Sequence, residues 1–227
     1  MPTNPYSQTT EPFQFHTRVH LQELTGLKAK NLAELLILVR SVPDAVIYHH
    51  THHFLQQHHY LSPEPPNDFA YWVTAALNEV KLGEKLASIN TCEYSTLQSL
   101  REKIVTMITE HLKKSKEPLK EASEGQEFYF IKSVSFILPT PYTASTLQEF
   151  IAVLKKVSIH SIYFHMFEAR LRLQRPTNDF SLWLEVQLGE KDLAKKIMRL
   201  DPYTQTLESL RNKIIQLGEA RLKEVMV

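Results

Sequence analysis

The stretch Thr96–Ile104 reads TLQSLREKI, and it returns as TLESLRNKI at Thr206–Ile214. In the first of these, Leu97, Leu100 and Ile104 recur at the three- and four-residue spacing of one helix face. Each stretch therefore predicts the start of a long amphipathic helix. A match of this length in a distant part of the chain indicates that one unit occurs twice.

The same correspondence extends outward from this helix through most of the chain. Adding 115 to a residue number between 13 and 50 gives the corresponding position in the second copy, between 67 and 87 the offset is 111, and many of these positions hold identical residues. The order of the matches is kept, and rare residues are among them, which indicates an internal duplication. The matched pairs include Phe13 and Phe128, Phe15 and Phe130, Tyr48 and Tyr163, His50 and His165, Asn67 and Asn178, Asp68 and Asp179, and Trp72 and Trp183.

Each copy has the same predicted elements. A short run of alternating apolar residues, which begins at Phe13 or Phe128, favours an extended segment, and four helical stretches follow it. We therefore predict a mainly α protein, a tandem duplication of a four-helix unit with a possible short extended segment at the start of each copy. One merged eight-helix core is the alternative. The predicted divisions are a polar N-terminal tail (1–12), helical repeat 1 (13–112), a charged linker (113–127) and helical repeat 2 (128–227).

Composition restricts the classes of partner and compartment. The chain has 227 residues, with 26 Lys and Arg against 25 Asp and Glu, so a nucleic-acid partner is not expected. A bilayer span needs roughly 20 consecutive apolar residues, and no stretch approaches that length, so a soluble protein is expected. The polar start lacks the pattern of a signal peptide, and Cys92 is the single cysteine. These features predict a cytoplasmic protein.

Two paired motifs carry a resemblance to a known family. Ile47–His50 reads IYHH and Ile162–His165 reads IYFH, while Asn67–Trp72 reads NDFAYW and Asn178–Trp183 reads NDFSLW. The chain resembles an uncharacterised bacterial domain-of-unknown-function family with paired Ile-Tyr-x-His and Asn-Asp-Phe-x-x-Trp motifs. The resemblance covers most of the chain in two passes. It implies a bacterial or archaeal origin and brings no established activity.

The histidines suggest a metal site. The chain has 11, and nine of them lie in the first copy, which is therefore the expected holder of a site. His50 and His53 are three residues apart, as are His165 and Glu168, so these four side chains could hold a divalent transition metal. No known zinc-binding motif is present, which favours structural or surface histidines instead. Acid–base chemistry at His50 or His165 is a third interpretation.

Other recurring residues allow a structural and a functional interpretation. Asp68 and Asp179, each preceded by Asn, are predicted to cap helices or to hold ligand residues in place. The recurring Tyr48 and Tyr163 are candidates for the same supporting roles. Trp72 and Trp183 are expected in the core. A basic group in the second copy could bind an anion, although a solvated basic face is the simpler account. The basic stretch comprises Arg170, Arg172 and Arg175, along with Arg211. Arg170 and Arg172 cannot share one helix face, and the anion-binding candidates are Arg170, Arg175 and Arg211.

The first functional hypothesis is a non-enzymatic binding or accessory protein, which holds a small molecule or a protein partner between its two copies. The absence of nucleotide-binding and hydrolase motifs motivates it. The alternative is a metal-binding sensor or a metal-dependent enzyme that uses the histidine-rich site. A carbohydrate or small-acid binder that uses the aromatic and arginine residues of the second copy is a third possibility. The sequence leaves the oligomeric state open.

Overall fold

The computed structural model describes residues 9–53, 66–115, 118–201 and 205–225. The chain divides into two compact units. Unit 1 comprises Met1–Val19, His59–Leu61 and Phe136–Val227, and unit 2 comprises His20–His58 and Ser62–Ser135. The boundaries cut through both strands, so each unit contains strand segments from both halves of the sequence.

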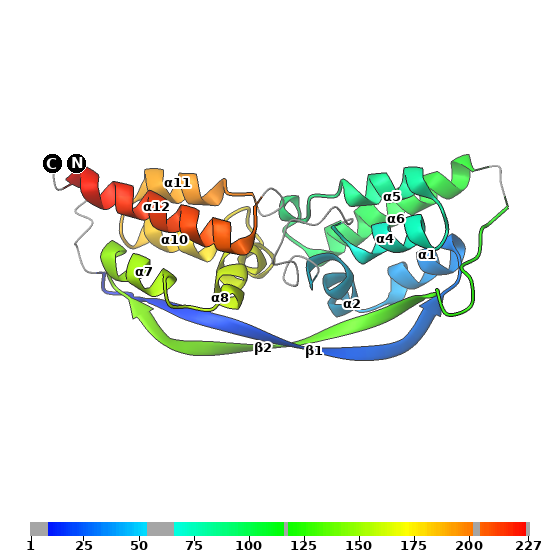
Figure 1. Cartoon of the computed structure of the whole chain (residues 1–227), viewed down its shortest axis with the longest axis horizontal. Coiled ribbons are helices and arrows are strands. Elements are labelled where there is room, and N and C mark those ends of the chain that lie inside the picture. The colour runs from blue at the N-terminus through cyan, green and yellow to red at the C-terminus, as the bar shows by residue number, and fades with distance from the viewer. Residues whose placement is uncertain (1–8, 54–65, 116–117, 202–204, 226–227) are drawn as a thin grey trace. The chain divides into compact units, whose positions relative to one another are not determined.

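Unit 2 contains the helices of the first half of the chain. They are α1 (Leu32–Ser41), α2 (Asp44–Tyr48), a π-helical turn (His49–His53), α4 (Asp68–Ala75), α5 (Val80–Ala87), a 3-10 turn (Thr91–Glu93) and α6 (Leu97–Lys114). Unit 1 contains the corresponding helices of the second half (Figure 1). They are α7 (Leu147–Leu154), α8 (Ile159–Tyr163), a π-helical turn (Phe164–Glu168), α9 (Ala169–Leu173), α10 (Asp179–Val186), α11 (Lys191–Met198) and α12 (Leu207–Val225).

A two-stranded sheet links the first half of the chain to the second. Among the described residues it consists of β1 (Phe13–Ala29) and β2 (Phe128–Ala144), each 17 residues long. The Thr25 hydroxyl donates to the Phe130 carbonyl (2.7 Å), and the Thr140 hydroxyl donates to the Phe15 carbonyl (2.8 Å). In both contacts the two residue numbers add up to 155. A constant sum means that the numbers rise along one strand as they fall along the other, so the two strands are antiparallel.

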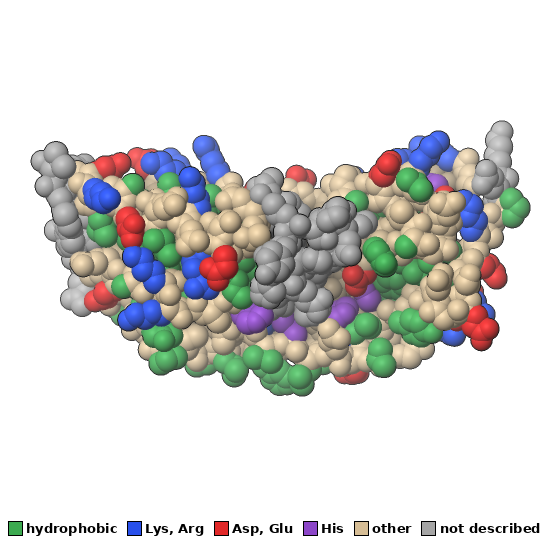
Figure 2. Space-filling view, in the orientation of Figure 1, with side chains coloured by type: hydrophobic (Ala, Val, Ile, Leu, Met, Phe, Trp, Pro, Cys, Tyr) green, Lys and Arg blue, Asp and Glu red, His purple; other side chains and the backbone are tan. Residues whose placement is uncertain are grey.

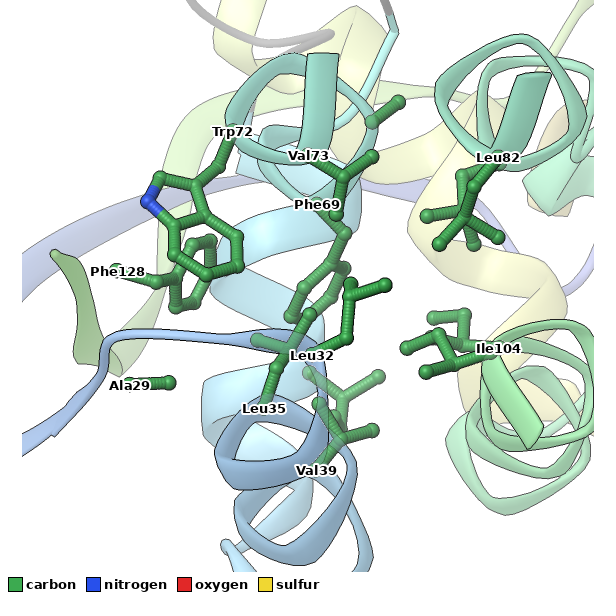
Figure 3. Packing of buried hydrophobic residues seen from close by; sticks show 14 of the residues in the cluster. Ala29, Leu32, Leu35, Val39, Phe69, Trp72, Val73, Leu82, Ile104 and Phe128 are labelled. Atoms are coloured by element: carbon green, nitrogen blue, oxygen red, sulfur yellow. The ribbon is translucent and has the colours of Figure 1, made fainter. Parts of the chain in front are cut away.

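Each unit completes its core with aromatic residues from the other half of the chain. In unit 2, Phe128 of β2 stacks on Phe69 of α4, with ring centroids 5.1 Å apart, and lies edge-on to Trp72 (Figure 3). In unit 1, Phe13 of β1 lies 5.4 Å from Phe180 and 5.6 Å from Trp183. Burial of one such phenylalanine contributes about 1.5–3 kcal/mol, so the exchanged strand ends are a large part of each core.

The prediction of a mainly α protein made of tandem four-helix units is wrong. The described residues form an α/β fold, because two long strands accompany the helices and pair with each other. The predicted repeats (13–112 and 128–227) divide the sequence into two consecutive halves. Each compact unit, in contrast, contains a strand segment from the other half of the sequence. Those divisions stay a prediction.

The length of the strands was hidden by their composition. Beyond Leu21, β1 loses the strict alternation of apolar and polar residues, and β2 contains Pro139 and Pro141. A proline lacks the N–H group that a central strand uses to pair with both of its neighbours. Pro139 and Pro141 are two residues apart, so the positions without an N–H group lie on the same edge of β2. A two-stranded sheet has no central strand, and its edges tolerate proline.

Apolar side chains remain exposed on the strands of both units. In unit 2, Leu24 is exposed by 75%, and in unit 1, Phe136 is exposed by 49%. Figure 2 shows apolar side chains along the part of the surface where the strands run. Of the helices in the described ranges, not one combines the length and the low polarity that a membrane span requires.

Candidate functional site

A buried histidine is paired with an aspartate in each unit. In unit 1, Nδ1 of His165 lies 2.7 Å from Oδ2 of Asp179, and the main-chain N–H of His16 donates to Nε2 of His165 (2.8 Å). In unit 2, Nδ1 of His50 lies 2.7 Å from Oδ2 of Asp68, and the N–H of Ile131 donates to Nε2 of His50 (3.0 Å). Each histidine therefore joins a helix N-terminus to a strand from the other half of the chain.

The helix starts explain how the aspartates reach the histidines. Asn178 caps α10 by accepting from the N–H of Ser181 (2.8 Å), and Asn67 caps α4 by accepting from the N–H of Ala70 (2.9 Å). With asparagine as the cap, the aspartate that follows is the first residue of the helix. Its carboxylate is then available to the histidine.

The hydrogen bonds fix the tautomer of both histidines. A main-chain N–H can donate to Nε2 only if Nε2 carries a lone pair, so the proton is on Nδ1 and is donated to the aspartate. Burial lowers the pKa of His165 below its ordinary value, Asp179 opposes this shift, and His16 and Arg172 add to it. His165 is therefore a neutral ring whose two nitrogens are both in use. This arrangement favours a structural role over acid–base catalysis.

The structure brings together a different group of potential metal ligands from the predicted one. One ligand atom each of His49, His50 and Asp68 lies within 4.8 Å of the others. Nδ1 of His49 lies 2.8 Å from the Ser133 hydroxyl. Metal binding at Nδ1 of His50 would require its proton to leave while Nε2 still accepts from Ile131, which would produce an imidazolate. The tautomer thus disfavours a metal at this cluster.

The four ligands predicted from the sequence are divided between the units. His50 lies in unit 2, and the side chain of His53 is outside the described residues. His165 and Glu168 lie in unit 1, where Glu168 is buried and forms an ion pair with Arg18 of β1. The four-ligand site stays a prediction.

The predicted supporting tyrosines have separate surroundings. The Tyr48 hydroxyl lies 3.3 Å from Nε2 of His20, and its ring stacks on His52. Tyr163 is fully buried, with its ring centroid 5.7 Å from that of Phe167. Both therefore belong to the packing around the π-helical turns.

The predicted anion-binding arginines also have different partners. Arg170 donates to the carbonyl of Met198, Arg211 pairs with Glu208, and Arg175 is exposed. None of the three lines the pocket described next.

Unit 1 contains a pocket of about 650 Å³ beside its histidine–aspartate pair. Its strand side is formed by residues 11–14, with His16 and Ile137, and its helix side by residues of the π-helical turn, α9 and α10. Trp183 forms part of the wall, and its indole N–H donates to the carbonyl of Glu11 (3.0 Å). The pocket is lined by segments from both halves of the sequence.

Arg172 provides the most distinctive polar group of this pocket. Its guanidinium carbon lies 4.8 Å from the ring centroid of Phe164, and one terminal nitrogen donates to Oδ2 of Asp179. Asp179 thus accepts from Arg172 and His165 on one oxygen. Arg172 follows His165 by seven residues, a spacing that puts two side chains on one helix face, so helical periodicity could have identified it. His16 had no comparable signal.

Known proteins similar to this chain include one family and one solved structure. A family of unknown function, DUF5752, matches residues 10–219. A solved structure of OrfY from Thermoproteus tenax has 29% sequence identity and a TM-score of 0.80, and the alignment covers 95% of this chain and 97% of OrfY. No curated protein matches the chain.

Proposed function

We propose that this chain, which belongs to the DUF5752 family of unknown function, binds a small molecule in the pocket of unit 1 and acts as a binding module. The volume of about 650 Å³ carries the proposal. It falls within the range typical of small-molecule sites, roughly 300–1,000 Å³. Such sites combine mainly apolar walls with a few polar groups, as Phe13, Phe164 and Trp183 do here with Arg172 and Asp179.

The walls of the pocket are held in place by protein contacts, which supports binding to a preformed site. Gln187 donates to the carboxylate of Glu11 (2.8 Å) and accepts from the Thr9 hydroxyl (3.0 Å). On the strand side, the Gln14 amide donates to the carbonyl of Thr140 (2.8 Å). Side chains that are already ordered lose little conformational entropy when a ligand arrives.

Binding without catalysis is favoured by the state of His165. A general base needs a free lone pair that faces the substrate, and Nε2 of His165 already accepts from the main chain of β1. Asp179 is likewise engaged by two donors on one oxygen. These contacts support the non-enzymatic hypothesis and the idea of a site to which both halves of the chain contribute.

The metal-binding alternative has one observation in its favour, which is the cluster of His49, His50 and Asp68. The tautomer of His50 weighs against it, so we give it second place. A cytoplasmic location and a bacterial origin remain part of the proposal on the sequence alone, the location because Cys92 is the single cysteine.

A pocket-filling variant tests the proposed function. Leu182 lines the pocket, and its counterpart in unit 2 is the exposed Tyr71, so Leu182→Trp and Tyr71→Trp form a matched pair. We expect saturation-transfer NMR to detect binding of small aromatic fragments to the natural protein and to Tyr71→Trp. Leu182→Trp should lose this binding. Equal binding by all three proteins would contradict the proposal.

A further inference from the structure

We infer that the ligand of the unit 1 pocket is an organic anion with a flat apolar body, whose acidic group is bound by Arg172. This inference rests on the proposed function and specifies the chemical class of its ligand. The polar residues that line this pocket differ in how many of their hydrogen-bond donors are already used within the protein.

Most polar groups in the pocket wall are already bonded to protein atoms. The amide of Gln14 donates to main-chain carbonyls, that of Gln187 donates to Glu11, and the indole of Trp183 donates to a carbonyl. These side chains shape the pocket but have little donor capacity left for a ligand.

Arg172 differs from these residues. A guanidinium has five N–H donors, and among the described residues the polar partner of Arg172 is Asp179, through one terminal nitrogen. Its side chain is exposed by 40% and lies over the ring of Phe164. The ring and the carboxylate orient the guanidinium plane, so the remaining donors form a preorganised fork of the kind that binds carboxylate or phosphate.

The acidic residues of the pocket are less suited to bind a cation. Asp179 already accepts from the neutral His165 and from Arg172, whose positive charge offsets the negative charge of the carboxylate. Glu11 is exposed to solvent and accepts from Gln187. A cationic ligand would have to compete with the guanidinium for Asp179, whereas an anionic ligand would add a second acceptor to Arg172.

The apolar part of the ligand is indicated by the neighbouring rings. Phe13 and Trp183 lie edge-on to each other, with centroids 5.6 Å apart, and both line the same pocket as Arg172. Flat apolar groups pack well against aromatic rings in edge-to-face or offset-stacked arrangements. An aryl or conjugated acid satisfies both parts of the pocket.

A charge series on one apolar body tests the inference. The probes are 2-naphthoate, the neutral 2-naphthamide and the cationic 2-naphthylmethylammonium. Binding is followed by quenching of Trp183 fluorescence in the full chain with Trp72→Phe, which leaves Trp183 as the single tryptophan. We expect 2-naphthoate to bind best, and 2-naphthyl phosphate to reveal whether the fork prefers carboxylate or phosphate.

Variants at the arginine assign the effect to one side chain. Arg172→Met should weaken 2-naphthoate by about tenfold to a hundredfold and leave 2-naphthamide unchanged, because it removes charged hydrogen bonds and keeps an apolar stem. The control is Arg175→Met, an exposed arginine outside the pocket. Unchanged 2-naphthamide binding shows that Arg172→Met is folded.

The outcomes separate the two claims. Preferential binding of the amide or the ammonium compound, or equal 2-naphthoate affinity in Arg172→Met, would overturn the anion inference and leave the pocket as a binding site. Failure of all the probes to bind at millimolar concentration would contradict the proposed function itself.

Discussion

Unit 1 and unit 2 contain the same pairing of a buried histidine with an aspartate but surround it differently. The side chain of Asp179 is exposed by 12%, and that of Asp68 by 45%. In unit 1 the residue before His165 is Phe164, which carries Arg172 on its ring; in unit 2 the residue before His50 is His49, which contacts Ser133. The counterpart of Arg172 is Gln57, which lies outside the described residues.

The comparison separates the residues that maintain the fold from those that form the candidate site. The positions that match between the two halves make equivalent structural contacts, such as the tryptophan indoles that donate to the carbonyls of Glu11 and Gln126. Most residues that line the pocket of unit 1 differ from the residues at the corresponding positions of the other copy. His16 corresponds to Ile131, Arg172 to Gln57, and Leu182 to Tyr71. Divergence between the copies is thus the better guide to function here.

The largest predicted effect concerns the exchanged strand ends. Phe13→Ala and Phe128→Ala remove nearly fully buried rings, so each should lower the free energy of unfolding by about 3–5 kcal/mol, measured by urea denaturation. The milder Phe13→Leu and Phe128→Leu should keep the fold.

Hydrogen exchange of the two tryptophan indoles then shows which unit is loosened. Phe13→Leu should accelerate exchange at Trp183, and Phe128→Leu should accelerate exchange at Trp72, because each ring contacts that tryptophan. If Phe13→Leu instead accelerated hydrogen exchange at Trp72, and Phe128→Leu at Trp183, each strand end would pack on the helices of its own half. That result would contradict the exchange of strand ends between the two halves.

The next effect is a dependence of stability on pH. Burial lowers the pKa of His165 in the folded protein below its ordinary value of 6.5, so the unfolded chain binds more protons as the pH falls. The contribution of His165 is therefore complete above about pH 6.5 and decreases below it, by up to about 1.4 kcal/mol per pH unit.

Variants isolate this contribution. His165→Gln should flatten the decrease between pH 6.5 and pH 5 in urea-denaturation curves. His160→Gln, a change at an exposed histidine of α8, should leave it unchanged. A full pH dependence in His165→Gln would show that other groups are responsible.

The smallest predicted effect is that of added metal. Because His50 is fixed as the Nδ1–H tautomer, zinc at twice the protein concentration should leave the melting temperature unchanged, and the protein purified without a histidine tag should contain no stoichiometric transition metal. Near-stoichiometric metal that disappears in His50→Ala would instead restore the metal-binding alternative to first place.

The sequence identified the residues that recur but not how they are arranged. His50, His165 and their aspartates attracted attention in the sequence because they recur in both copies, and the structure places each histidine against its aspartate. The matching offset of 115 residues could not tell which strand packs on which helices, since exchanged and unexchanged units have the same local periodicity. The contact between Phe13 and Trp183 is of this kind.

Two features of the candidate site were missed for different reasons. Arg172 was set aside in favour of Arg170 and Arg175, although its spacing from His165 puts the two on one helix face. His16 lies on a strand whose partner comes from the other end of the chain, so its position beside His165 depends on long-range pairing. No local pattern reports such pairing.

The indole N–H signals of the two tryptophans show whether the ligand binds in unit 1, because each unit contains one of them. In a ¹⁵N-labelled full chain titrated with 2-naphthoate, we predict that the Trp183 signal shifts in a saturable manner while the Trp72 signal stays in place. A shift of Trp72 with no change at Trp183, or no change in either signal at millimolar 2-naphthoate, would contradict a ligand site in unit 1.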